Sequence, residues 1–237
     1  MKQRMCARER VGDVAVVTLD DGGQNRISGP SCAAIRGELA ALAADEAVRA
    51  VVLTGGEKFF CNGLDLDWMK TQGKRELFGF LMDVSALLKD TALFPKPLIG
   101  AISGHAFGLG AIWSSGFDFR LVRKDRGWIC YPEMDIDIPF SPGMIAICEH
   151  GLGTRLFREM AWSAKRYSGE EAAAAGWARG ALDGGEALRE AALELAGFMA
   201  KKGVNAFRLT KQTWARGVVE VIDTRDAAAY AKIPLRF

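Results

Sequence analysis

The chain has 237 residues, of which 49% are hydrophobic and 25% are charged, and it contains 27 glycines but only 7 prolines. This composition excludes collagen-like and generally disordered proteins, and the length suits one large domain, with or without a small appendage. Lys and Arg outnumber Asp and Glu by only 31 to 29, so the charge offers no support for nucleic-acid binding.

Strand patterns alternate with helical patterns over the first two thirds of the chain. Apolar and β-branched runs bounded by Gly, Asp or Pro predict strands at 14–19, 49–55, 98–103, 119–122 and 128–131. Apolar residues at helical spacing predict helices at 31–44, 76–93, 141–150 and 154–162. Such alternation is typical of an α/β protein.

Ala-rich helical patterns replace the strand patterns beyond residue 165. They predict helices at 169–175, 186–202 and 205–216. Strands that alternate with helices and are followed by helices alone indicate an α/β core with a helical C-terminal extension. We therefore divide the chain into a core of residues 1–170 and a helical region of residues 171–237.

One uncharged run, residues 97–117, is long enough to span a bilayer. It contains five Gly, three Ser, one His and one Pro, however, so we interpret it as a buried strand, a tight Gly turn and the start of a buried helix. The N-terminus lacks the apolar stretch of a signal peptide, and the five cysteines are scattered without a Cys-x-x-Cys pair. We therefore expect a cytoplasmic protein that does not enter a membrane.

The sequence lacks several common catalytic motifs. It has only two His, which excludes a His-rich metal site, and it has no G-x-S-x-G, P-loop or complete G-x-G-x-x-G motif. Two Gly-bearing loops remain, at 58–66 and 103–111, each directly after a predicted strand or close to one. A strand that turns abruptly into a helix leaves unpaired N–H groups at the helix start, and two such starts that face each other would form an oxyanion hole.

The two loops resemble those of the crotonase (enoyl-CoA hydratase/isomerase) superfamily. The sequence F-C-N-G-L-D at 60–65 is similar to the family's F-S/A-A-G-x-D motif, and G-H-A-F-G-L-G-A at 104–111 is similar to its G-x-A-x-G-G-G motif. The preceding P-K-P-L-I-G-A-I, the early G-D-V-A-V-V-T-L…N-R-I-S and the later S-G-E-E-A-A-A-A-G also resemble the family pattern. The resemblance implies a spiral of repeated ββα units, closed by C-terminal helices and assembled as a trimer or hexamer.

The resemblance also implies the ligand, an acyl-CoA thioester. Coenzyme A is then part of the substrate, and no separate cofactor or metal is expected. The thioester oxygen would accept hydrogen bonds from the backbone N–H groups of Asn62 and Leu109, although Leu109 replaces the usual middle Gly. Each such donor contributes roughly a few kcal/mol to catalysis. Further residues implied to contact the substrate are Cys61, Gly63, Leu64, Asp65, Gly108, Gly110, Ile112 and Lys211.

The general base is predicted to be Glu133. Hydratases of the family carry two Glu, and the first of these aligns with Ile112 while the second aligns with Glu133. A single carboxylate is poorly suited to adding water to a double bond and well suited to moving one proton between two carbons. The segment W-I-C-Y-P-E-M-D-I-D-I-P resembles the Δ3,Δ2-enoyl-CoA isomerase branch, which acts in fatty acid metabolism.

The resulting hypothesis is that Glu133 takes a proton from C2 of a 3-enoyl-CoA and returns it to C4, giving the trans-2-enoyl-CoA. The flanking Met134, Ile136 and Phe140 are expected to exclude water from the carboxylate and raise its pKa. Another reaction of the family, hydration or thioester hydrolysis, remains an alternative. A non-catalytic acyl-CoA-binding protein is a third.

Several residues also have plain structural interpretations. Asp135 and Asp137 alternate with Ile and would mark the exposed face of an extended stretch. His105 would be a hydrogen-bonded core residue, Cys61 would pack without acting as a nucleophile, and Asp65 would cap the following helix. The basic run from Lys201 to Arg216, which includes Lys211, is either a solvated helix face or a contact for CoA phosphates.

Overall fold

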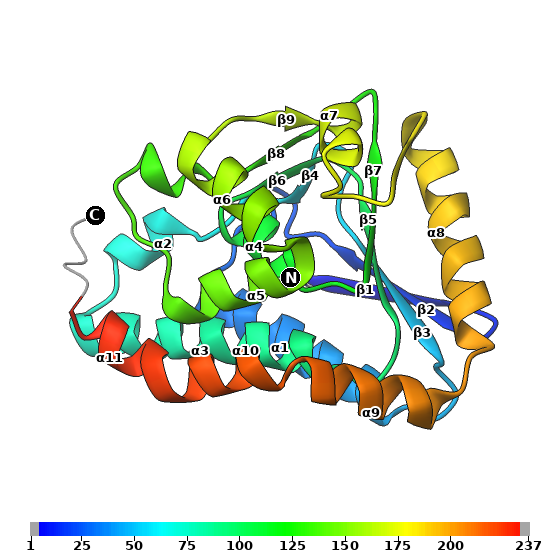
Figure 1. Ribbon diagram of the computed structural model, residues 1–237, viewed down its shortest axis with the longest axis horizontal. Helices are drawn as coiled ribbons and strands as arrows, with labels where there is room; N and C mark the ends of the chain where they lie inside the picture. Colours follow the sequence, from blue (N-terminus) through cyan, green and yellow to red (C-terminus); the bar gives the residue numbers. More distant parts are fainter. Residues whose placement is uncertain (1–4, 233–237) are drawn as a thin grey trace.

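The computed structural model describes residues 5–232 and contains two sheets (Figure 1). The six-stranded sheet has the order β1-β2-β3-β5-β7-β10 and the four-stranded sheet has the order β4-β6-β8-β9. The strands of the large sheet are β1 (Cys6–Val11), β2 (Val14–Leu19), β3 (Ala50–Thr54), β5 (Leu98–Ile102), β7 (Phe119–Arg123) and β10 (Gly180–Leu182). The strands of the small sheet are β4 (Phe59–Cys61), β6 (His105–Phe107), β8 (Trp128–Cys130) and β9 (Tyr167–Ser168).

The helices lie between and around these strands. The first seven are α1 (Gly29–Ala44), α2 (Leu66–Lys70), α3 (Lys74–Ala92), α4 (Leu109–Ser115), α5 (Pro142–Leu152), α6 (Thr154–Ser163) and α7 (Gly169–Ala174). The later ones are α8 (Gly184–Ala200), α9 (Val204–Trp214), α10 (Arg216–Val221) and α11 (Ala227–Tyr230). A 3₁₀ turn, η1 (Pro132–Met134), follows β8, and a π-helical turn, η2 (Ile222–Asp226), joins α10 to α11.

The strands and helices repeat as a spiral of ββα units, as predicted. Strand β3 of the large sheet is followed by β4 of the small sheet and then by α2, and β5-β6-α4 and β7-β8-η1 repeat this order. Neighbouring strands of successive units pair in parallel in both sheets. Because the units stack in register, the segments that leave β4, β6 and β8 emerge side by side.

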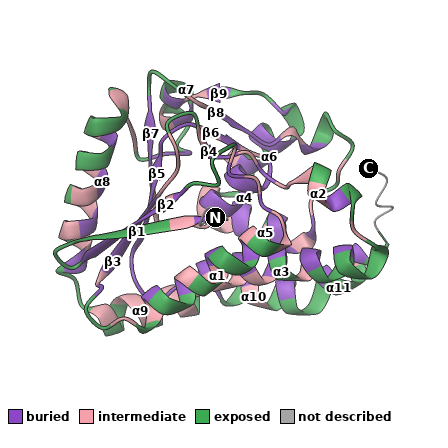
Figure 2. Ribbon diagram, turned by 180° about the vertical axis from the view of Figure 1, so that it is seen from behind, coloured by how far each residue is buried: buried purple, intermediate pink, exposed green. Residues whose placement is uncertain are grey.

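The centre of the large sheet is buried on both faces, which explains why β2, β3 and β5 consist almost entirely of apolar residues. Val14 and Val16 of β2 pack with α8, whereas Ala15 and Val17 point into the main core on the opposite face. Figure 2 shows this buried centre and the exposed outer surfaces of the helices. The two edge strands differ from this centre: β1, which pairs antiparallel, is almost entirely exposed, and all three residues of β10 are only partly buried.

The uncharged run forms two strands and a helix, because a second short strand, β6, lies where only a Gly turn was predicted. Residues 97–117 contain β5, β6 and α4, and all seven residues of α4 are buried. Within the described part of the chain, no helix is long and apolar enough to cross a membrane. The interpretation of this run as a buried strand and a buried helix start is therefore confirmed.

Residues beyond 165 differ from the prediction in two places. Tyr167–Ser168 and Gly180–Leu182 are strands, so the expectation of helices alone is wrong there. Both strands are two or three residues long and join existing sheets, and such short segments carry no alternation that a sequence pattern could reveal. The division of the chain near residue 170 stays a prediction, although β10 and α8 attach to the large sheet.

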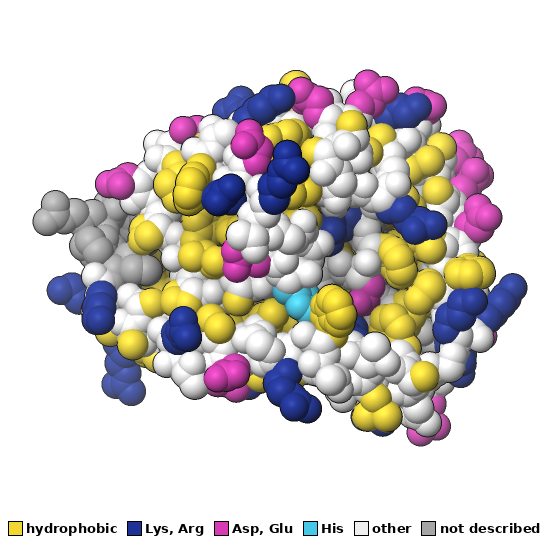
Figure 3. All heavy atoms as spheres, viewed as in Figure 1, with side chains coloured by type: hydrophobic (Ala, Val, Ile, Leu, Met, Phe, Trp, Pro, Cys, Tyr) yellow, Lys and Arg dark blue, Asp and Glu magenta, His cyan; other side chains and the backbone are white. Residues whose placement is uncertain are grey.

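The C-terminal helices fold back across their own core. Helices α10 and α11 lie along α3, and α10 also packs against α5 (Figure 1). Helix α9 has no buried residue (Figure 2). On the face shown in Figure 3, basic and acidic side chains are interspersed, as the small net charge leads one to expect.

Candidate active site

The two Gly-bearing loops pack directly against each other. Gly63 has a φ of +85°, and a Cβ placed on it would lie 2.8 Å from the Phe107 carbonyl oxygen and 3.3 Å from the Leu109 nitrogen. A Cβ on Gly110 would lie 2.2 Å from the Cys61 carbonyl oxygen. No larger residue fits at either position, so the glycines are what allows the first loop to touch the start of α4.

The first turn of α4 presents an unpaired donor. Gly108 precedes the helix with φ 51° and ψ −124°, a conformation that favours Gly, and the first helical hydrogen bond runs from Ile112 N–H to the Gly108 carbonyl. Within residues 5–232 the N–H of Leu109 has no acceptor, as expected for the first residue of a helix. Leu109 therefore begins α4 with a free N–H and a buried side chain, and its contact with the thioester oxygen stays a prediction.

The prediction for the second donor, the backbone N–H of Asn62, has to be corrected. Its backbone N–H donates to the Gln24 carbonyl at 3.1 Å, and its side-chain amide donates to Gln24 Oε1 at 2.9 Å. A donor that is already paired in this way is not available to a ligand. The prediction for the Asn62 N–H is therefore wrong.

Leu64 offers the free donor in this loop. Ile27 forms a parallel bridge with Leu64, in which its N–H donates to the Gly63 carbonyl at 2.8 Å and its carbonyl accepts from the Asp65 N–H at 2.9 Å. Ile27 is thus hydrogen-bonded to Gly63 and Asp65, the residues on either side of Leu64. The N–H of Leu64 itself has no acceptor in the described part of the chain. The sequence could not show this, because it depends on contacts with residues nearly forty positions away.

Asn25 holds this loop in place and was not singled out from the sequence. It is buried, has a φ of 53°, and its side-chain amide donates to the Leu19 carbonyl at 2.9 Å and to the Phe60 carbonyl at 3.1 Å. Its Oδ1 accepts the N–H of Asp21 at 3.0 Å. One side chain is thereby hydrogen-bonded both to the end of β2 and to β4, the strand that leads into the loop.

Glu133 lies at the junction of the two loops. A Cβ placed on Gly108 would lie 3.3 Å from Glu133 Oε1 and 4.0 Å from both the Gly63 Cα and the Pro132 Cδ. Glu133 is 7% exposed, and its buried Oε2 has no hydrogen-bond partner among the described residues. Burial raises the pKa of Glu133 from 4.5 to about 7. A carboxyl group with this pKa exchanges protons readily near neutral pH.

The source of this burial differs from the prediction. Met134 is 50% exposed and Ile136 is 48% exposed, so about half of each of these residues faces solvent. Phe140 is partly buried and packs against Tyr131 at 6.4 Å between ring centroids, inside the neighbouring core. Glu133 is buried because η1 turns its side chain toward Gly108 rather than because apolar neighbours surround it in sequence.

The segment after Glu133 is a turn and not an extended stretch. The N–H groups of Asp135 and Ile136 both bond to the Pro132 carbonyl, and Asp137 has a φ of +55°. The extended conformation predicted here is therefore wrong. Asp135 and Asp137 are nevertheless exposed, as expected.

Other predicted site residues have clear structural partners. Cys61 is fully buried and its pKa is raised to about 12 by burial, so it is a packed thiol and not a nucleophile at neutral pH. Asp65 accepts the N–H of Trp68 at 3.1 Å and caps α2, as predicted. His105 accepts the Trp128 N–H at 3.2 Å, and burial lowers its pKa. Ile112, which was predicted to stand where the hydratases carry their first Glu, is buried in α4.

Lys211 forms an ion pair with another residue of its own chain. Its Nζ lies 2.7 Å from Asp118 Oδ2, and the side chain is 9% exposed. Asp118 also accepts the Leu98 N–H at 2.8 Å, so this ion pair ties α9 to the large sheet. A contact between Lys211 and CoA phosphates remains a prediction and would have to compete with Asp118.

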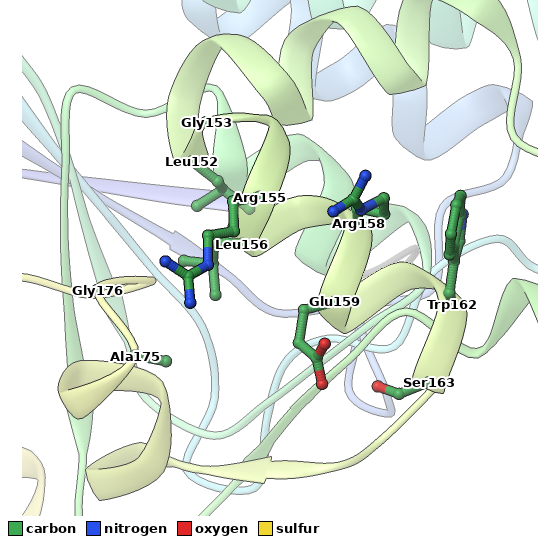
Figure 4. Close-up of a pocket in the computed structure, with 10 residues that line it drawn as sticks. All are labelled: Leu152, Gly153, Arg155, Leu156, Arg158, Glu159, Trp162, Ser163, Ala175 and Gly176. Atoms are coloured by element: carbon green, nitrogen blue, oxygen red, sulfur yellow. The ribbon is translucent and has the colours of Figure 1, made fainter.

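A hollow of about 860 Å³ opens elsewhere on the surface, between α6 and the turn after α7. Arg155 projects from α6 toward Ala175 and Gly176, and Glu159 projects from the same helix further along (Figure 4). No residue of the two loops or of η1 lines this hollow. Among the described residues, no group of three or more His, Cys, Asp or Glu is placed to hold a metal ion. The junction of Gly63, Gly108 and Glu133 is therefore the candidate active site.

Comparison with known proteins gives concordant matches. Residues 9–230 match the enoyl-CoA hydratase/isomerase family. The chain is 30% identical over 207 residues to enoyl-CoA delta isomerase 3 of Arabidopsis thaliana, covering 85% of this chain and 87% of that protein. It is 27% identical over 218 residues to the short-chain-enoyl-CoA hydratase of Clostridium acetobutylicum, covering 91% of this chain and 83% of that protein.

The fold is shared with solved structures. An enoyl-CoA hydratase/isomerase family protein from Pseudomonas syringae superposes with a TM-score of 0.88 at 24% identity. The superposition covers 96% of this chain and 97% of that one. At this level of identity the match shows the architecture alone.

Proposed function

The chain belongs to the enoyl-CoA hydratase/isomerase family, and from this premise we propose that it is an isomerase that converts 3-enoyl-CoA to trans-2-enoyl-CoA. The observation that carries the proposal is the single carboxylate at the site. Glu133 is buried beside the two Gly-bearing loops, and Ile112 is predicted to stand where hydratases of the family carry the first of their two Glu. One carboxylate suffices to move a proton between two carbons, whereas the addition of water needs a second group to activate the water.

In the proposed reaction Glu133 acts first as base and then as acid. The ionised carboxylate takes a proton from C2 of the 3-enoyl thioester, which leaves a dienolate. The protonated Glu133 then delivers the proton to C4, and the double bond comes into conjugation with the thioester. A pKa of about 7 suits both steps, because neither the acid nor the base form is strongly favoured near neutral pH.

The N–H groups of Leu64 and Leu109 would hold the dienolate oxygen. Both are free within the described chain, and they belong to two loops that touch through Gly63. Donors fixed in advance stabilise the negative charge that develops on the thioester oxygen without having to reorganise. Coenzyme A enters as part of the substrate. We further propose a cytoplasmic trimer or hexamer, as expected from the sequence and the family.

The proposal is tested by product analysis with 2-enoyl-CoA and 3-enoyl-CoA thioesters of several chain lengths. An isomerase produces conjugated absorbance from 3-enoyl-CoA. A hydratase instead removes that absorbance from trans-2-enoyl-CoA, and a thioesterase releases free CoA thiol. Binding without turnover of any thioester would indicate a non-catalytic protein, and each of these last three outcomes would overturn the isomerase assignment.

The contribution of the Leu109 N–H can be measured with Leu109→Pro. Proline removes this one donor, and its ring is tolerated at the first position of a helix. We expect kcat to fall by about 10²–10³-fold, the usual effect of losing one oxyanion donor. Leu109→Ala is the matched control, because it also removes the buried side chain but keeps the N–H. Equal activity of the two variants would show that the donor is not used.

A further inference from the structure

Tyr131 links the strand that leads to Glu133 to a buried hydrogen-bond network. It lies two residues before Glu133, directly after β8, and is fully buried. Its hydroxyl accepts the indole N–H of Trp177 at 2.8 Å and lies 2.6 Å from the hydroxyl oxygen of Ser115, at the end of α4. Nothing in the proposed reaction requires this tyrosine to contact substrate.

The direction of these hydrogen bonds is determined by the donors. An indole N–H can only donate, so Tyr131 accepts from Trp177. The Ser115 hydroxyl donates to the Ala111 carbonyl at 2.7 Å, so its oxygen is left to accept from Tyr131. The resulting chain runs from Trp177 through Tyr131 and Ser115 to the backbone of α4, and a break at Tyr131 leaves the buried Trp177 N–H without a partner.

Arg120 fixes both ends of this chain. Its guanidinium donates to the Trp177 carbonyl at 2.6 Å and to the Ser115 and Phe117 carbonyls at 2.9 Å and 3.0 Å. Arg120 is buried, and every hydrogen bond that it makes in the described chain goes to a backbone carbonyl. The C-terminal end of α4 and the Trp177 backbone are thereby held together, and the Tyr131 hydroxyl connects the Glu133 segment to them. The N-terminal end of α4 is joined to the same segment by the Gly108 N–H, which donates to the Cys130 carbonyl at 3.0 Å.

We propose that Tyr131 is a positioning residue, whose hydroxyl sets the distance between Glu133 and the helix that presents the Leu109 N–H. The inference rests on the proposed function, since it assigns these two groups to one reaction. The base and the oxyanion donor must act on the same thioester, the base at C2 and the donor at the oxygen on C1. They come from different ββα units, so their relative position depends on contacts between those units, and a displacement of about 1 Å can cost about 10²-fold in rate.

The aromatic ring of Tyr131 is held independently of its hydroxyl. It packs edge-on against Phe157, with ring centroids 5.8 Å apart, and against Phe140 at 6.4 Å. Tyr131→Phe therefore keeps the packed ring and removes only the link to Ser115 and Trp177. Tyr167→Phe is a matched control, because Tyr167 is a buried tyrosine on β9, beside β8, and its hydroxyl has no partner within the described residues.

The test compares wild type, Tyr131→Phe and Tyr167→Phe with 3-enoyl-CoA as substrate. We expect Tyr131→Phe to lower kcat by about tenfold or more with KM within twofold of wild type, and Tyr167→Phe to match wild type. We also expect the pKa of Glu133 to fall toward its ordinary value in Tyr131→Phe, because a displaced carboxylate gains water. This titration is followed by ¹³C NMR of labelled glutamate carboxyls, with Glu133→Gln identifying the signal.

The outcomes distinguish a failure of the positioning role from a failure of the proposed function. Wild-type kcat and an unchanged Glu133 titration in Tyr131→Phe would overturn the positioning role. Absence of turnover by the wild type would overturn the proposed function, and the NMR titration would still test the positioning role. If Tyr131→Phe does not fold, Ser115→Ala breaks the same link from the α4 side and is expected to give the same loss of kcat and the same shift.

Discussion

Glu133→Gln is expected to reduce isomerase activity by about 10³-fold or more while the protein stays folded, because this carboxyl is the one group proposed to carry the proton. Glutamine has nearly the same shape, so the contact with Gly108 and the packing of η1 are retained. Its amide cannot take a proton from C2. The measurement is kcat on 3-enoyl-CoA, with Asp135→Asn as control because Asp135 is the exposed carboxylate in the same turn.

The same residue predicts the pH dependence of the wild-type enzyme. The base must be ionised in the free enzyme, and burial raises the pKa of Glu133 to about 7. The value of kcat/KM should therefore rise with pH, reach half its maximum near pH 7 and level off above pH 8. The thiols of Cys130 and Cys148 feel the charge of Glu133 but have pKa values raised well above this range. A profile that is flat from pH 5 to pH 9, or an active Glu133→Gln variant, would contradict the role of Glu133.

The parts of the site that sequence could predict are those encoded within short segments. Gly63, Gly108 and Gly110 stand where a Cβ would strike backbone or catalytic atoms, so the need for Gly is visible in the motif itself. Leu109 follows as the first residue of a helix, and its free N–H is a consequence of helix geometry. The long, apolar central strands were also predicted, because burial on both faces leaves a continuous hydrophobic run.

The parts that could not be predicted depend on contacts between distant segments. The N–H of Asn62 is taken by Gln24 and that of Leu64 is left free by Ile27, and no local pattern distinguishes these two neighbours. The burial of Glu133 comes from the direction of a 3₁₀ turn rather than from the apolar residues beside it. Strand β1 was missed because it is a polar edge strand, whose exposed residues carry no hydrophobic pattern.

The buried Glu133 also predicts a loss of stability as the pH rises to neutral. Its pKa is about 7 in the folded protein and 4.5 in the unfolded chain, so between these values the folded state binds more protons. The free energy of unfolding must then decrease as pH rises from about 4.5 to about 7. Above that range it stays lower by the full amount. A difference of this size corresponds to about 3 kcal/mol. The unpaired Oε2 is the structural origin of this cost, because no described donor compensates the ionised oxygen.

Glu133→Gln should remove this dependence and make the inactive protein the more stable one. At pH 8 we expect the variant to unfold with a free energy up to about 3 kcal/mol greater than wild type, and at pH 4 the two should agree within about 1 kcal/mol. Urea unfolding at pH 4, 6 and 8 measures the difference, and Asp135→Asn should follow wild type throughout. A Gln variant less stable than wild type at pH 8 would mean that the ionised carboxylate has a stabilising partner. If the Gln variant is the more stable protein at pH 8, one side chain accounts for both the activity and the lower free energy of unfolding at that pH. The burial that makes Glu133 a useful base also disfavours its ionised form.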